Sequence, residues 1–344
     1  MRNEGHEKWL SSFVELFSLC DVRESSPVVI LSESESRALN LALCEAALER
    51  IGAQWAHVRV PSKKQSSCIP VRSTGASDAL SGHALAVAML SAADLIVDCS
   101  VEGLLHSPEL KLAMDKGARL AMISNEHPDV LERVGHEPKL QARVLSARKH
   151  LQQAEVMTVT SLHGTRLRVG LRGAAIGGNW GFCTQPGTRS HWPGGLVACS
   201  PAANTVSGLL VLAPGDANLT FKRYIESPVR LHIEDDYVVQ IEGAGVDAEL
   251  LRSYMAAWKE PQAYAVSHVG WGLNPRARWE ALTMYDKADI NGTELRVFEG
   301  NFLFSTGANE HAGRYTRGHF DIPMRNCSVY LDDKPVVLNG ALCD

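Results

Sequence analysis

The chain has 344 residues, of which 45% are hydrophobic and 21% charged, as expected for a globular protein of one large domain or two. Its 34 Lys and Arg against 39 Asp and Glu give a net charge of −5, which argues against a nucleic-acid-binding protein. The most apolar stretch, His83 to Val97, is interrupted by Ser91 and Asp94 and is too short for a membrane helix. The charged N-terminus also lacks a signal-peptide core. We therefore expect a cytoplasmic protein whose eight cysteines are reduced and mostly buried.

The first 150 residues alternate helix and strand signals, which predicts a parallel sheet covered by helices. Short β-branched runs such as Pro27 to Leu31 (PVVIL) are typical of buried parallel strands. Helices are predicted where apolar residues recur at helical spacing before a glycine such as Gly52. In chain order we predict a helix over Glu7–Cys20, a strand over Pro27–Leu31, a helix over Arg37–Ile51, a strand over Trp55–Val60, a helix over Ser77–Ala93, a strand over Asp94–Cys99, a helix over Pro108–Lys116 and a strand over Leu120–Ser124.

The pattern changes after a long polar helix predicted over Glu137–Ala154, which we interpret as a connector. Beyond it, Gly170–Gly215 is rich in Gly, Pro, Ser and Thr, and most apolar segments are short and strand-like. The predicted fold class is therefore α/β, with an N-terminal parallel-sheet domain over residues 1–154 and a strand-rich α+β domain over residues 155–344. The predicted strands are Val156–Ser161, Thr165–Leu171, Val229–Ile233, Tyr237–Ile241, Glu294–Phe298, Phe302–Ser305 and Ser328–Leu331, and one helix is predicted over Asp247–Trp258.

Several nucleotide-binding and hydrolase motifs are missing or incomplete. The segment Gly243–Ala248 (GAGVDA) follows a predicted strand and opens a helix, but no βαβ unit follows it. We interpret it as a glycine turn with Asp247 near the helix N-terminus. The chain has neither a P-loop nor a G-x-S-x-G nucleophile elbow, which argues against those enzyme classes.

His319-Phe320-Asp321, in the segment RGHFDIP, is the best candidate for a pair of metal ligands. In an extended segment, residues two apart project from the same face, where one metal can use both side chains. His268 is the best third ligand, because it ends an apolar stretch at a Gly-rich turn where backbone can pack closely. Two histidines and one carboxylate are the ligand set of non-haem Fe(II) oxygenases, which leaves positions open for substrate and O2. From the spacing alone, a hydrogen-bonded histidine beside a surface aspartate is the commoner arrangement.

The segments HVGWGLNP (268–275) and HFD (319–321) resemble the metal-binding segments of 2,5-dihydroxypyridine 5,6-dioxygenases. The similarity extends over nearly the whole chain. The resemblance implies a single Fe(II) bound by His268, His319 and Asp321. It also implies that O2 cleaves the C5–C6 bond of 2,5-dihydroxypyridine to give N-formylmaleamic acid, in the bacterial breakdown of nicotinate and related pyridines.

Three further residues match the family's substrate-pocket positions: His106 in EGLLHSPEL, His191 in TRSHWPGG and Ser305 in NFLFSTG. The near-neutral titration of histidine suits His106 as the base that takes the substrate's hydroxyl proton or as a group that holds the ring. A structural histidine in a strand-to-helix loop is the alternative. His191 lies in a Gly/Pro-rich loop, a common place for site residues, and Ser305 offers a hydroxyl to the substrate or caps a turn.

A wider similarity links these dioxygenases to a family of two-metal aminopeptidases. Gly164-Thr165-Arg166-Leu167 resembles the Gly-Thr-Asp-Leu hairpin of the peptidases. However, Gly195 and Leu196 stand where the peptidases carry a metal-binding glutamate, and His268 stands in place of a second one. Because a bridged two-metal site needs several carboxylates, a metallo-aminopeptidase is kept as the alternative enzyme and a non-catalytic binding protein as the third class. A homo-oligomer is expected, since strand-rich domains often leave edges that partners cover.

Overall fold

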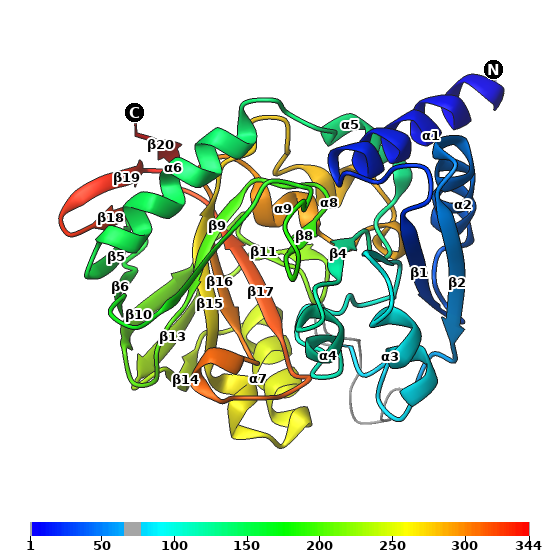
Figure 1. Ribbon diagram of the computed structural model, residues 1–344. Coiled ribbons are helices and arrows are strands. Elements are labelled where there is room, and N and C mark those ends of the chain that lie inside the picture. Colours follow the sequence, from blue (N-terminus) through cyan, green and yellow to red (C-terminus); the bar gives the residue numbers. More distant parts are fainter. Residues whose placement is uncertain (1, 65–76, 344) are drawn as a thin grey trace.

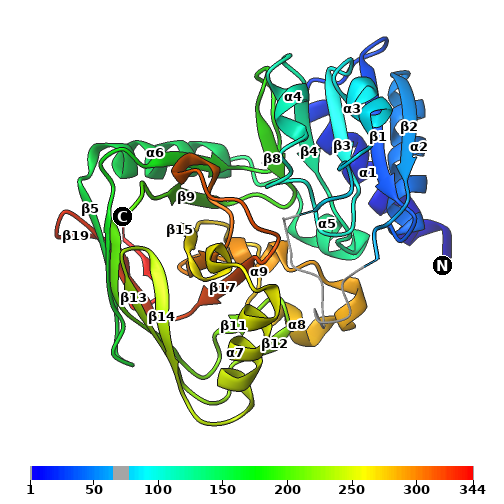
Figure 2. The ribbon, with the colours of Figure 1, turned by 90° about the horizontal axis from the view of Figure 1, so that it is seen from below.

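The computed structural model describes residues 2–64 and 77–343, which form a parallel α/β unit and a strand-rich unit lying side by side (Figures 1 and 2). The N-terminal helices and β1–β4 make up the first unit, and most strands from β5 onward make up the second. This arrangement confirms the predicted fold class. In the part of the chain that the structure describes, no helix has the length and apolar character that crossing a bilayer requires. The described cysteines are all free, as predicted, and all of them except Cys343 are buried.

The sheet of the α/β unit is parallel throughout, with strand order β2-β1-β3-β4-β8. Alternate side chains of β1 enter different apolar clusters, because successive residues of a strand point to opposite faces. Val28 and Ile30 pack with helices α1, α2 and α5, whereas Val29 and Leu31 pack with α3 and α4. The elements are α1 (Arg2–Leu19), β1 (Pro27–Glu33), α2 (Ala38–Ile51), β2 (Gln54–Val60), α3 (Ala84–Leu90), β3 (Leu95–Asp98), α4 (Leu110–Met114), β4 (Arg119–Met122) and α5 (Pro128–Val134).

The last strand of this sheet comes from far along the chain. Helix α6 (Leu140–Gln153) packs on β7 (Ala175–Asn179) and β9 (Leu196–Ser200) of the second unit. The chain then returns to the first unit, where β8 (Arg189–His191) pairs in parallel with β4. The pairing sets Met122 beside His191. A predicted site residue therefore lies at the carboxyl edge of the parallel sheet although it follows residue 155.

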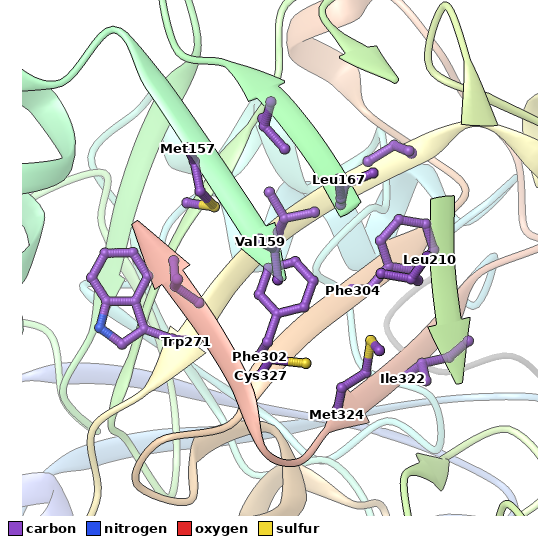
Figure 3. Packing of buried hydrophobic residues seen from close by; sticks show 14 of the residues in the cluster. Met157, Val159, Leu167, Leu210, Trp271, Phe302, Phe304, Ile322, Met324 and Cys327 are labelled. Atoms are coloured by element: carbon purple, nitrogen blue, oxygen red, sulfur yellow. The ribbon is translucent and has the colours of Figure 1, made fainter. Parts of the chain in front are cut away.

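The strand-rich unit consists mainly of two antiparallel sheets with one apolar core. The first sheet has the order β14-β13-β10-β6-β5-β18-β19-β20 and the second β17-β16-β15-β9-β7. Figure 3 shows the buried side chains between them, among them Leu210, Phe302, Phe304 and Ile322. The second sheet lies on the side of the α/β unit (Figure 2). The elements are β5 (Val156–Ser161), β6 (Arg166–Gly170), β7 (Ala175–Asn179), β9 (Leu196–Ser200), β10 (Val206–Leu212), β11 (Ala217–Asn218), β12 (Arg223–Tyr224), β13 (Val229–Glu234), β14 (Tyr237–Glu242), α7 (Val246–Trp258), η1 (Pro261–Tyr264), β15 (Val266–Gly272), α8 (Ala281–Met284), η2 (Lys287–Asp289), α9 (Thr293–Val297), β16 (Phe302–Thr306), η3 (Glu310–Ala312), β17 (Phe320–Met324), β18 (Cys327–Leu331), β19 (Lys334–Leu338) and β20 (Ala341–Leu342).

Three local predictions are wrong. The segment predicted as a strand over Glu294–Phe298 forms the short helix α9, since a run of five residues does not distinguish helix from strand by periodicity. Of the helix predicted over Ser77–Ala93, only α3 forms. Gly82, at a φ of +82°, lies in the turn that precedes α3, a conformation that an α-helix does not contain. The Gly-rich segment after His268 is also part of a strand, β15, and not a turn.

Candidate metal centre

A cavity lies between the carboxyl edge of the parallel sheet and the second antiparallel sheet. Ligands of α/β proteins commonly bind at this edge of a parallel sheet. The α/β side contributes the loop after β3, Ser124 after β4, and His191 at the end of β8. The opposite side contributes His268 and Asp321, from strands β15 and β17, and α9. Both units are therefore needed to form the cavity.

The three predicted ligands converge on one point. Nε2 of His319 lies 3.2 Å from Oδ1 of Asp321, and Nε2 of His268 lies 3.6 Å from the same oxygen. The side chains of His319 and Asp321 are only 1% and 4% exposed, so they are shielded from bulk water. The sheet brings His268 of β15 close to Asp321 of β17, because β15 pairs with β16 and β16 pairs with β17.

His106 joins this cluster from the other unit. One ligand atom of each of His106, His268 and His319 lies within 4.8 Å of the corresponding atoms of the other two. The ring centroids of His106 and His319 are 4.8 Å apart. The geometry thus offers either Asp321 or His106 as the third ligand beside the two histidines of the strand-rich unit.

The protonation states of the cluster suit a divalent cation. Burial lowers the pKa of His268 to about 3, so its ring is neutral at physiological pH. Burial alone would raise the pKa of Asp321, but the charge of Arg296 and the neighbouring His319 hold it well below its usual range. Arg296 Nε donates to Oδ2 of Asp321 at 2.6 Å. A metal needs neutral imidazole and ionised carboxylate, and both are present here.

A hydrogen bond to Nδ1 fixes the orientation of the His268 ring. The hydroxyl of Ser267 donates to the carbonyl of Ala308, so it is an acceptor for His268 Nδ1, 3.1 Å away. The Nδ1–H tautomer leaves the Nε2 lone pair directed at Asp321, which is the usual way in which a neighbouring residue orients a metal-binding histidine. The Ser305 hydroxyl donates to Oδ1 of Asp321 and lies 3.0 Å from His268 Nε2.

Two ring nitrogens of the cluster have no hydrogen-bond partner among the described residues. His106 Nε2 and His319 Nδ1 are buried, and no side chain or backbone group of residues 2–64 or 77–343 hydrogen-bonds to them. Buried polar atoms are almost always paired in folded proteins. The unpaired Nε2 of His106, the neutral ring of His268 and the ionised carboxylate of Asp321 together fit a bound metal ion and a polar substrate at this position.

Glu310 orients His106 across the boundary between the two units. Nδ1 of His106 lies 2.8 Å from Oε1 of Glu310, and this imidazole is 6% exposed. Burial lowers the pKa of His106, opposed by the Glu310 hydrogen bond. Burial also acts to raise the pKa of Glu310, but the contact with His106 outweighs it and holds the pKa at about 2. His106 therefore donates from Nδ1 and keeps the Nε2 lone pair free for a proton or a metal.

His191 is the most separate of the predicted site residues. It lines the cavity, and burial together with the charges of Arg296 and Arg189 lowers its pKa to about 3. It is a neutral imidazole at physiological pH, suited to hydrogen bonding with a substrate. Four of the six predicted residues line the cavity: His191, His268, His319 and Asp321. The other two contact these lining residues, His106 through the rings of His268 and His319 and Ser305 through Asp321.

Gly270 and Gly272 let neighbouring backbone approach β15 closely. A Cβ on Gly270 would lie 2.0 Å from the carbonyl oxygen of Val197, and one on Gly272 would lie 2.0 Å from that of Phe298. Side chains at these positions are excluded by contact with backbone. The close packing predicted for this segment is present, although it occurs within a strand.

Comparison with known proteins identifies the family. The family model described as NicX, 2,5-dihydroxypyridine 5,6-dioxygenase, matches residues 8–344. The chain belongs to the 2,5-dihydroxypyridine 5,6-dioxygenase family. A 2,5-dihydroxypyridine 5,6-dioxygenase of Pseudomonas putida KT2440 is 38% identical to it over 334 residues, or 95% of this chain and 94% of the relative. The solved structure of the 2,5-dihydroxypyridine dioxygenase from the same strain superposes with a TM-score of 0.92 at 36% identity, covering 98% of this chain and 97% of that one.

A more distant structure shares the fold of this dioxygenase-family chain. Wild-type AmpT from Thermus thermophilus superposes with a TM-score of 0.65 at 12% identity, covering 98% of this chain and all of that one. At this identity the likeness shows the fold alone.

The sequence analysis missed two residues that contact the predicted site residues of this dioxygenase-family chain. Arg296 was assigned to a strand, and its contact with Asp321 joins residues 25 positions apart. Glu310 contacts His106 across 204 positions. The local sequence around a charged residue in a short segment does not indicate which distant residue it contacts. Their roles follow from the tertiary fold.

Proposed function

We propose that this chain is a 2,5-dihydroxypyridine 5,6-dioxygenase, which uses one Fe(II) held by His268, His319 and Asp321 to cleave the C5–C6 bond of its substrate with O2. The observation that carries the proposal is the convergence of these side chains in a cavity of a family member. The product would be N-formylmaleamic acid, which contains the whole substrate and both oxygen atoms of O2.

A bound Fe(II) would supply the electron transfer between ring and triplet O2 that the two do not undergo directly at a useful rate. The remaining functions fall to the chain's own residues. Arg296 keeps Asp321 ionised and fixes one of its oxygens, which leaves the other directed at the two histidines. The apolar core behind β15–β17 holds these strands rigidly.

His106 is the proposed base for the 5-hydroxyl group. Its Nε2 is buried and unpaired among the described residues, and its Nδ1–H is bound by Glu310. When the 5-hydroxyl proton of the substrate moves to Nε2, the imidazole of His106 becomes a cation. The ionised carboxylate of Glu310 beside it stabilises this imidazolium. His191 and Ser305 are proposed to orient the substrate through hydrogen bonds.

An oxygen-electrode assay with purified, Fe(II)-reconstituted protein and 2,5-dihydroxypyridine tests this function. We expect one O2 consumed per substrate, and both atoms of ¹⁸O2 incorporated into a product with the mass of N-formylmaleamic acid. A protein that consumes no O2 with this substrate, or that is equally active after replacement of iron by Zn²⁺, would refute the proposal.

Replacing the ionic partner of Asp321 should weaken metal binding. Arg296→Gln removes the charge that keeps Asp321 ionised, and loss of such an outer contact commonly costs about 10- to 100-fold in metal affinity. Chelator competition measures this affinity. Arg172→Gln is the matched control, because its guanidinium is 87% exposed and pairs with Glu155 at the surface. Equal affinity in wild type and Arg296→Gln would remove Arg296 from the site.

Metal content distinguishes the two possible third ligands. We expect Asp321→Ala to lose most of its iron, and His106→Ala to retain iron while losing at least about 100-fold in turnover, as for a removed general base. Elemental analysis and the oxygen electrode measure the two quantities on the same samples. The reverse result, with iron lost from His106→Ala and kept in Asp321→Ala, would assign a three-histidine site.

A further inference from the structure

We propose that Asn179 recognises the oxygen on C2 of the substrate, a specificity role that rests on the proposed function and goes beyond it. Asn179 ends β7, an edge strand of the second antiparallel sheet, and it lines the cavity together with His191 and the metal cluster. Its backbone is held against the neighbouring strand, since it pairs with Leu196 of β9 and its carbonyl accepts from Gly195 N–H at 2.7 Å.

The side-chain oxygen of Asn179 is fully occupied. Oδ1 accepts from the backbone N–H of Gly181 at 3.2 Å, from the backbone N–H of His191 at 3.1 Å and from the Ser190 hydroxyl at 2.6 Å. Two of these donors are main-chain groups, and one of them belongs to His191, which lines the cavity. The contacts fix the position and the plane of the amide group.

These contacts also decide which end of the amide faces the cavity. A backbone N–H only donates, so a rotated amide would set its NH2 against two donors. The observed orientation is therefore enforced, and Nδ2 is left on the other side. Across residues 2–64 and 77–343, the structure gives Nδ2 no hydrogen-bond acceptor. Asn179 thus offers a rigid, unused donor to a ligand in the cavity.

The chemistry of the substrate supplies a matching acceptor. In 2,5-dihydroxypyridine the two oxygens lie at opposite ends of the ring. With the C5 oxygen at His106 and the metal ligands, the C2 oxygen is the remaining exocyclic polar atom. In the pyridone form it is a carbonyl, which only accepts. The hydroxyls of Ser124 and Thr293 also line the cavity, but a hydroxyl rotates and either donates or accepts, whereas Asn179 is fixed as a donor.

The test compares two ligands that differ in the C2 oxygen. 3-Hydroxypyridine keeps the hydroxyl equivalent to that on C5 but has no oxygen at the position of C2. Anaerobic calorimetric titration of the Fe(II)-loaded protein gives the affinity for each ligand without turnover. In wild type we expect 2,5-dihydroxypyridine to bind roughly tenfold or more tightly than 3-hydroxypyridine, since one net hydrogen bond separates them.

Two variants remove the donor in different ways. Asn179→Ala deletes the amide, and Asn179→Asp keeps the oxygen that binds Gly181 and His191 but has no NH2 group. In both, the preference for 2,5-dihydroxypyridine should fall to about twofold or less, with the affinity for 3-hydroxypyridine unchanged. Asn326→Asp is the matched control, because Asn326 is exposed in the turn between β17 and β18 and the change adds the same charge outside the cavity.

Each outcome decides the assignment. A wild-type preference retained in both variants overturns the role of Asn179. Equal losses for both ligands, or a loss of iron from the variants, would make Asn179 a structural residue and also overturn it. A wild-type protein that consumes no O2 with 2,5-dihydroxypyridine would refute the proposed function itself, and is thus distinguishable from a failure confined to Asn179.

Discussion

The variant His319→Ala is expected to lose its metal and nearly all turnover. His319 is 1% exposed, lies 3.2 Å from Asp321 and contacts the rings of both His106 and His268. Removing it takes away one of the three proposed metal ligands. Because a catalytic metal contributes several kcal/mol to the barrier, we expect kcat to fall by about 10³-fold or more. Iron per chain and O2 uptake with 2,5-dihydroxypyridine are the measurements.

The control for this variant is His150→Ala, the same change at an exposed histidine in the last turn of α6. It should keep wild-type iron content and turnover. Circular dichroism and the urea midpoint of His319→Ala show whether the fold is retained. A folded His319→Ala protein with a full complement of iron would contradict the ligand assignment.

Among the proposed variants, Leu210→Ala is expected to cause the largest loss of unfolding free energy. Leu210, on β10, is fully buried between the two antiparallel sheets, in the same cluster as Phe304 and Ile322 (Figure 3). Truncating a buried leucine removes apolar contacts and leaves a cavity, which costs about 2–5 kcal/mol of unfolding free energy. Urea unfolding followed by tryptophan fluorescence measures the change.

Leu162→Ala makes the same chemical change at the turn between β5 and β6, where Leu162 is 91% exposed. Its unfolding free energy should stay within about 0.5 kcal/mol of wild type. Similar losses in the two leucine variants would show that the core between the sheets does not dominate stability. The strands that carry His268, Ser305 and Asp321 would then need another source of rigidity.

Much of the local secondary structure could be predicted from the sequence. The β-branched runs of β1 and β3 and the helix ending at Gly52 predicted the parallel unit, because a strand buried on both faces needs continuous apolar residues. The period-2 spacing of His319 and Asp321 likewise placed both side chains on one face of an extended segment. The resemblance to the dioxygenases, confirmed by the family comparison, added His106 and His191.

The contacts between residues far apart in the sequence could not be predicted from the sequence. The short strand β8 has no apolar run of its own, and it forms because β4 offers an unpaired parallel edge. The segment Thr293–Val297 becomes a helix in which the buried Glu294 pairs with Arg133 of α5 through hydrogen bonds of 2.9 and 2.6 Å. That tertiary ion pair overrides the strand pattern of the segment. The same helix places Arg296 against Asp321, so a wrong local assignment concealed a site residue.

The most direct test of the account is a crystal structure of the Fe(II)-loaded protein, with anomalous diffraction recorded on both sides of the iron absorption edge. We predict one iron peak per chain, within bonding distance of a ring nitrogen of His268, a ring nitrogen of His319 and a carboxylate oxygen of Asp321. Two metal peaks in the cavity, or a single peak bonded to none of these three side chains, would contradict it.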